Sequence, residues 1–223
     1  MTHPALQPGH RALDLRCYLV TSGSDRRTVE VAAQAAAAGA GVVQVRAKDA
    51  TTAELLELVL AVAKAVHTAR PATRVLVDDR ADVAAAARAR GAHVHGVHLG
   101  QDDLPVADAR ALLGHDAVIG LTTGTLYLVR ASAEVAFDLD YLGAGPFRRT
   151  PTKDSGREPL GVEGYPALVR ATMLPIVAIG DVTPADVPAL TRTGIAGVAL
   201  VRSVMDAPDP AAVVGEVLTG MGA

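Results

Sequence analysis

The chain reads Cys17-Tyr18-Leu19-Val20-Thr21-Ser22-Gly23-Ser24-Asp25 near its N-terminus, and this segment distinguishes between two α/β folds. Its first five residues form a short β-rich run, which is typical of a strand, and the next four favour a turn. In a doubly wound open sheet, the first strand normally runs into a glycine-rich fingerprint that binds phosphate. The turn residues here do not supply that fingerprint, so the segment favours a closed barrel.

Seven further apolar, β-rich runs follow and alternate with helical patterns, at spacings of roughly two to three dozen residues. Runs that are buried on both faces indicate a parallel sheet, and eight right-handed crossovers close readily into a barrel. We therefore predict a single (β/α)8 TIM barrel over residues 17–223, after a short N-terminal extension of residues 1–16. The further strands are expected at 42–46, 74–77, 96–100, 117–121, 140–143, 175–179 and 197–201. Helices are expected at 28–38, 52–69, 80–90, from 105 onward, and at 126–137, 163–171, 184–192 and 209–218.

Composition excludes several classes of function. The 223 residues carry a net charge of −3, and aromatic residues make up 3% with no Trp, which argues against nucleic-acid partners and anionic membrane surfaces. The single cysteine, Cys17, excludes an intrachain disulfide and a cysteine-rich metal site. No signal peptide and no apolar run near the ~18 residues of a membrane span are visible. We expect a cytoplasmic enzyme or binding protein.

Cationic side chains gather at the end of the second predicted strand. Gln44, Arg46 and Lys48 are spaced by two, so an extended chain points all three to one face. Catalytic residues of such barrels lie at the carboxyl ends of the strands. Two cations at an apolar barrel mouth are costly unless an anion meets them, so the pattern predicts an anionic ligand.

Acidic pairs end the next two strands. Asp78 and Asp79 close the third strand, and Asp102 and Asp103 follow the fourth. Adjacent strand ends lie ~5 Å apart, so one carboxylate from each pair could share a cation. Carboxylates combined with a substrate phosphate and waters are the usual magnesium arrangement. The alternative is that these acids cap helices or occupy their first turns, which is also favourable.

Phosphate-binding features follow the sixth strand, in the segment 143–156. Its glycines allow backbone N–H groups to approach a ligand, Thr150 and Thr152 add hydroxyls, and Lys153 adds a compact cation. Thr122, after the fifth strand, could cap the next helix or donate to a phosphate. An ordinary solvated turn would explain the segment 143–156 equally well by itself.

The loops after the seventh and eighth strands, 179–183 and 201–203, occupy a recurrent phosphate site of this fold. The barrel rim would then hold two phosphate groups, as an enzyme that joins two phosphorylated small molecules requires. His93, His95 and His98 resemble a metal cluster, but no fourth ligand is spaced for zinc. We interpret these histidines as structural or solvated.

These motifs resemble the thiamine phosphate synthase family over most of the chain, from Tyr18 to about Asp206. The resemblance implies Mg²⁺-dependent coupling of hydroxymethylpyrimidine diphosphate with hydroxyethylthiazole phosphate to give thiamine phosphate and diphosphate. The matching segments are Gln44-Val45-Arg46-Ala47-Lys48, Asp79, Asp103, Thr122, Thr150-Pro151-Thr152-Lys153 and Val201-Arg202.

The resemblance also implies roles for individual residues. The expected catalytic residues are Arg46, Lys48 and Lys153. The pyrimidine diphosphate is expected to contact Gln44, Arg46, Lys48, Asp78, Thr122 and Lys153. The thiazole phosphate is expected to contact Thr150, Thr152, Asp181, Val201 and Arg202. Asp79 and Asp103 are the expected Mg²⁺ ligands.

Four positions depart from the family pattern. Asp78 replaces a usual Asn, Gly124 a common His, Asp181 a glycine and Arg202 a common Ser. A carboxylate at either acidic position would repel a phosphate unless a cation screens it. The alternatives to the synthase are a thiazole tautomerase of the same superfamily and a non-catalytic barrel that senses a phosphorylated ligand. The sequence leaves the oligomeric state open, a homo-oligomer included.

Overall fold

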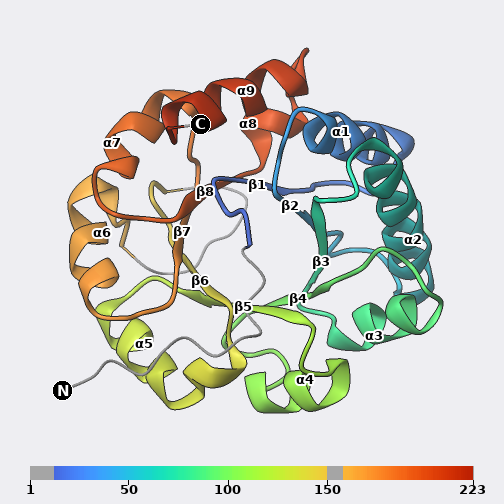
Figure 1. Ribbon diagram of the computed structural model, residues 1–223, viewed down its shortest axis with the longest axis horizontal. Helices are drawn as coiled ribbons and strands as arrows, with labels where there is room; N and C mark the ends of the chain where they lie inside the picture. Colours follow the sequence, from blue (N-terminus) through green and yellow to red (C-terminus); the bar gives the residue numbers. More distant parts are fainter. Residues whose placement is uncertain (1–12, 150–157, 223) are drawn as a thin grey trace.

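The computed structural model describes residues 13–149 and 158–222, and its eight parallel strands close into a barrel inside a ring of helices (Figure 1). Neighbouring strands pair in sequence order, and β8 pairs with β1. The predicted (β/α)8 fold is confirmed. The strands are β1 (Cys17–Val20), β2 (Val42–Val45), β3 (Arg74–Asp78), β4 (Gly96–Leu99), β5 (Val118–Thr123), β6 (Tyr141–Ala144), β7 (Ile176–Ile179) and β8 (Gly197–Leu200).

Helices cover the outer surface of the barrel and follow the strands in order (Figure 1). Capping starts the long second helix, since Thr51 and Glu54 form a reciprocal capping box. The helices are α1 (Arg26–Ala37), α2 (Thr52–Ala69), α3 (Ala81–Ala89), α4 (Val106–Leu113), α5 (Leu126–Ala131), α6 (Gly161–Arg170), α7 (Val187–Thr191), α8 (Arg202–Met205) and α9 (Pro210–Gly220), with 3-10 turns η1 (Ser132–Asp138) and η2 (Pro184–Asp186).

Successive side chains of each strand point to opposite faces of the sheet, so they belong alternately to two apolar regions. Tyr18, Leu76, Tyr141 and Val177 pack together inside the barrel. Their strand neighbours, such as Leu19, belong to the larger core between the strands and the helices. This alternation leaves the inward positions at the carboxyl ends of the strands for polar side chains.

The helical regions differ from prediction at three places. The helix expected at 126–137 is α5 followed by the 3-10 turn η1, in which Val135 has a non-helical backbone. The helix expected at 184–192 is split into η2 and α7, each with a proline in its first turn that offers no N–H for a continuous ladder. The short helix α8 was not predicted, because four residues carry no readable periodicity.

No helix within residues 13–149 and 158–222 combines the length and the apolar character needed to cross a bilayer. The boundary of the N-terminal extension stays a prediction, since residues 1–12 lie outside the described part of the chain.

Candidate active site

A cavity of about 400 Å³ opens at the carboxyl ends of the strands, with walls from the strands and the loops that follow them. It has the size of a small-molecule site. Nine of the residues expected from sequence line it: Gln44, Arg46, Lys48, Asp78, Asp79, Thr122, Asp181, Val201 and Arg202. Thr150, Thr152 and Lys153 lie outside the described residues, so their expected roles stay predictions.

The end of β2 presents its polar residues to the cavity as the spacing predicts. Gln44, Arg46 and Lys48 all line the cavity, while Val43 and Val45 are buried in the outer core. The Arg46 backbone N–H donates to the Thr21 hydroxyl at 3.0 Å, which ties the end of β2 to that of β1. Two cations therefore face one cavity.

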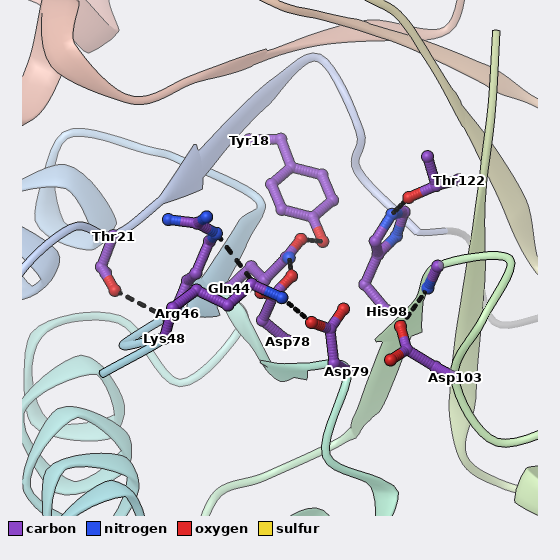
Figure 2. Close-up of polar contacts among 11 residues, drawn as sticks. Tyr18, Thr21, Gln44, Arg46, Lys48, Asp78, Asp79, His98, Asp103 and Thr122 are labelled. Carbon is purple, nitrogen blue, oxygen red and sulfur yellow. Dashed lines mark hydrogen bonds and ion pairs between the residues drawn. The ribbon is translucent and has the colours of Figure 1, made fainter. Parts of the chain in front are cut away.

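Asp78 lies between these cations at the end of β3. Its Oδ2 is 3.4 Å from Arg46 Nε and 3.5 Å from Lys48 Nζ, and its Oδ1 accepts from Gln44 Nε2 (Figure 2). Only 11% of the Asp78 side chain and 21% of the Arg46 side chain are exposed, so water screens the attraction between these two groups weakly. The carboxylate expected to repel an anion is thus neutralised by its neighbours.

Asp79 and Asp103 follow the neighbouring strands β3 and β4 (Figure 2). Asp79 contacts the Lys48 ammonium and has a φ of 60°, a left-handed conformation that Asp and Asn tolerate better than most residues. One oxygen of Asp103 accepts from the Gly100 N–H at 2.6 Å. Among the described residues, Asp103 is the expected site residue that does not line the cavity.

The donor set suits Mg²⁺ only in part. Two carboxylates on adjacent strand ends provide the hard oxygen ligands that Mg²⁺ prefers. The Asp79 carboxylate already pairs with one cation, the ammonium of Lys48. Over the described ranges, however, no three His, Cys, Asp or Glu side chains converge to hold a metal. A metal here would therefore need ligand oxygens from the substrate as well.

A buried polar chain forms the floor of the cavity. The Tyr18 hydroxyl donates to Gln44 Oε1 at 2.6 Å and lies 2.7 Å from the Tyr141 hydroxyl. His98 Nδ1 lies 2.8 Å from the same Tyr141 oxygen. Its Nε2 lies 2.9 Å from Thr122 Oγ1 (Figure 2). Burial raises the pKa of both tyrosines, so each phenol keeps its proton.

The three histidines interpreted as structural or solvated do not lie together, and His98 is set apart from the other two. It lines the cavity, whereas His93 and His95 lie at the other end of the barrel, where His93 Nε2 is 3.0 Å from the Thr73 carbonyl oxygen. Burial lowers the pKa of His95 to about 3, so that ring is neutral. The signal for His98 was its place in β4, where it alternates with the outward-facing Val97 and Leu99.

The loops after β7 and β8 are joined by an ion pair. Arg202 donates to the Asp181 carboxylate at 2.5 Å, and Arg148 donates to the Asp181 carbonyl oxygen at 3.1 Å. Arg148 is itself held by two contacts to Asp186. Burial opposes ionisation of the Asp186 carboxyl, but hydrogen bonds from Arg148 and Thr183 hold its pKa below the usual value. The two departures at 181 and 202 therefore offset each other.

Gly124, where the resemblance leads one to expect a histidine, has a backbone conformation that suits glycine. Its φ of 145° is a conformation that L-residues with a side chain rarely adopt, so a histidine here would strain the backbone.

Comparisons with known proteins agree with this geometry. Residues 17–204 match the family model described as thiamine monophosphate synthase. The chain is 61% identical to a thiamine-phosphate synthase of Corynebacterium jeikeium over 201 residues, covering 90% of this chain and 92% of that protein. It is 59% identical to the protein of the same name from Corynebacterium efficiens, covering 94% and 96% respectively.

Solved structures extend the likeness. A thiamine phosphate pyrophosphorylase from Pyrococcus furiosus superposes with a TM-score of 0.78 at 29% identity, covering 94% of this chain and 96% of that one. A 3-hexulose-6-phosphate synthase superposes with a TM-score of 0.66 at 17% identity, covering 93% and 100%, and shares the fold. The family model and the two relatives together establish that the chain belongs to the thiamine monophosphate synthase family.

Proposed function

We propose that this protein couples 4-amino-5-hydroxymethyl-2-methylpyrimidine diphosphate with 4-methyl-5-(2-hydroxyethyl)thiazole phosphate to form thiamine phosphate and diphosphate. The observation that carries the proposal is the meeting of Arg46, Lys48 and Asp79 in one cavity with the buried amide of Gln44. The cations would stabilise the negative charge of a departing diphosphate. The buried side chains in the cavity floor would form hydrogen bonds with a flat heterocycle. The family and the relatives named thiamine-phosphate synthase support the same reaction.

The chemistry breaks one bond and forms another. The carbon–oxygen bond to the diphosphate breaks and the electron pair leaves with that oxygen, while the lone pair of the thiazole nitrogen forms the new carbon–nitrogen bond. The attraction of Arg46 and Lys48 for the departing oxygen strengthens as negative charge builds on it. The two cations therefore stabilise the transition state more than the bound substrate. Lys153 would act in the same way. No protein nucleophile is required.

The cations of the site are not free before the substrate binds. Arg46 and Lys48 are held by Asp78, and Lys48 also contacts Asp79. A diphosphate would compete with these carboxylates for the same two side chains. Asp78 therefore keeps the cations pointing into the cavity at some cost in diphosphate affinity.

Magnesium is part of the proposal, with Asp79 and Asp103 as its protein ligands. When bound, Mg²⁺ would neutralise charge on the diphosphate, as it does in phosphate-transferring sites generally. Lys48 would then have to release Asp79, and its ammonium would become available to the diphosphate.

The second phosphate is assigned to the loops after β7 and β8, together with Thr150 and Thr152. Val201 and Arg202 line the cavity there, beside Asp181. The guanidinium of Arg202 provides a cation, which balances the carboxylate that it contacts. The resulting site is close to neutral before the thiazole phosphate arrives.

Incubation with both substrates tests the function. Release of diphosphate that requires Mg²⁺ and both substrates supports the synthase. Binding of one phosphorylated ligand without turnover would support the sensor, and conversion of a thiazole substrate alone without Mg²⁺ would support the tautomerase. Oligomeric state and cytoplasmic location stay predictions.

A further inference from the structure

We infer that Asp78 imposes a single direction on the hydrogen-bond chain in the cavity floor, which fixes His98 as its Nδ1–H tautomer and makes Thr122 an acceptor toward the cavity. The chain runs from β3 through β2, β1, β6 and β4 to β5. Its members are, in order, Asp78, Gln44, Tyr18, Tyr141, His98 and Thr122, of which all but Tyr141 are labelled in Figure 2.

The direction starts at Asp78 because a carboxylate only accepts hydrogen bonds. Two cations stand beside it, Arg46 at 3.4 Å and Lys48 at 3.5 Å. The atom of Gln44 that faces Asp78 must therefore be the amide nitrogen, and the carbonyl oxygen must face Tyr18. That oxygen cannot donate, so Tyr18 uses its only hydroxyl proton on it, at 2.6 Å.

The donor and acceptor roles of the remaining members, across the barrel, follow from the proton of Tyr18. With the Tyr18 proton committed, the 2.7 Å contact between the two phenols requires Tyr141 to donate. The Tyr141 oxygen is then the acceptor in its 2.8 Å contact with His98, so Nδ1 carries the hydrogen. A neutral imidazole with hydrogen on Nδ1 has a lone pair on Nε2, and Thr122 must donate to it at 2.9 Å.

Burial supports the links between Gln44, Tyr18 and Tyr141. Tyr18 and Tyr141 are 1% and 0% exposed, and Gln44 is 4% exposed, so water does not offer these groups alternative partners. Among the described residues, no buried side-chain polar atom lacks a hydrogen bond. A reversed link would set two lone pairs or two protons against each other in the interior, at the cost of an unsatisfied buried group.

The direction of the chain determines which ligand group can bind at Thr122. Since Thr122 spends its proton on His98, its oxygen presents only lone pairs to the cavity, and the group that meets it must be a hydrogen-bond donor. This part rests on the proposed function, in which the exocyclic amino group of the pyrimidine is the donor that the substrate offers. The expected contact between Thr122 and a bare diphosphate oxygen is then unfavourable. An asparagine at 78 would not force this direction, because its amide both donates and accepts.

Nitrogen NMR on the ligand-free protein tests the direction of the hydrogen-bond chain by showing which ring nitrogen of His98 carries the hydrogen. The experiment involves no turnover, so its outcome does not depend on whether the proposed function is correct. The seven histidines are labelled with ¹⁵N, and the His98 signals are identified by their loss in His98→Gln. Above neutral pH we expect a protonated Nδ1 and an unprotonated Nε2. An Nε2–H ring or an imidazolium would overturn the inference.

Two tyrosine variants sharpen the test. Tyr18→Phe removes the group that receives the Tyr141 proton, so Tyr141 should donate to His98 and the ring should change to its Nε2–H tautomer. Tyr165→Phe is the matched control, because Tyr165 is a fully buried tyrosine outside the chain that donates to the Ala144 carbonyl at 3.0 Å. His98 should be unchanged in that variant. An unchanged tautomer in Tyr18→Phe, or an equal change in both variants, would contradict the chain.

Discussion

Arg202 contacts Asp181 through a 2.5 Å hydrogen bond that joins the loops after β7 and β8 at the rim of the cavity. Both residues depart from the pattern that the family resemblance implies, and each explains the other. The carboxylate would repel a phosphate, and the guanidinium offsets that charge. The side chains are 46% and 35% exposed, so the pair affects ligand affinity more than folding stability.

Breaking this pair should weaken the second substrate selectively. Arg202→Ser leaves Asp181 without its guanidinium partner, so we expect the KM for the thiazole phosphate to rise about three- to ten-fold. Adding Asp181→Asn should restore the KM, since Asn tolerates the left-handed backbone at φ 58° and carries no charge. Steady-state kinetics on the single and double variants measure this, and equal KM values in both would contradict the electrostatic account.

A substitution at Asp79 tests whether this residue is a ligand of the metal. Asp79→Asn keeps a residue suited to φ 60° and removes the charge, so the fold should persist while Mg²⁺-dependent diphosphate release falls at least about 100-fold. Circular dichroism and thermal unfolding control for structure. Undiminished turnover at saturating Mg²⁺ would remove Asp79 from the metal site.

Gly120 should be intolerant of a side chain for a packing reason. A Cβ at Gly120 would overlap the ring of Tyr141, so Gly120→Ala should lower the free energy of unfolding by about 1–3 kcal/mol and disturb the cavity floor. Gly215 is a matched control on α9, where a Cβ meets nothing within 4 Å. Gly215→Ala should stabilise by about 0.5–1 kcal/mol. Urea unfolding compares the two, and an equal effect on both would refute the packing argument.

His95 should contribute to acid sensitivity. Burial lowers its pKa from 6.5 to about 3, so between these values the unfolded chain binds a proton that the folded chain does not. Stability is then complete above pH 6.5 and falls as the pH approaches 3, by on the order of 2 kcal/mol after allowance for partial exposure. His95→Asn should flatten this dependence in urea unfolding at several pH values. An unaltered pH slope would show that His95 is not responsible.

Much of the fold was predictable because hydrophobic periodicity reports it directly. Eight buried runs marked the strands, and the helix predicted at 52–69 has the bounds of α2 in the structure. The short elements were not predictable in the same way. Prolines divided the region of η2 and α7, and α8 is too short to show a repeat.

The candidate site was predictable where spacing sets direction. Gln44, Arg46 and Lys48 share a face because the strand period is two, and the structure places them in one cavity. The link between Tyr18 and Tyr141 could not be read from sequence, since strands β1 and β6 meet only across the closed barrel. Closure, rather than any local motif, brings those hydroxyls together.

The measurement that bears most directly on the central claim is product analysis of the reaction with both substrates and Mg²⁺. The convergence of cations and carboxylates in one cavity predicts thiamine phosphate and diphosphate in equal amounts, with neither formed when Mg²⁺ or either substrate is omitted. Diphosphate released without thiamine phosphate, or no product from correctly folded protein, would contradict it.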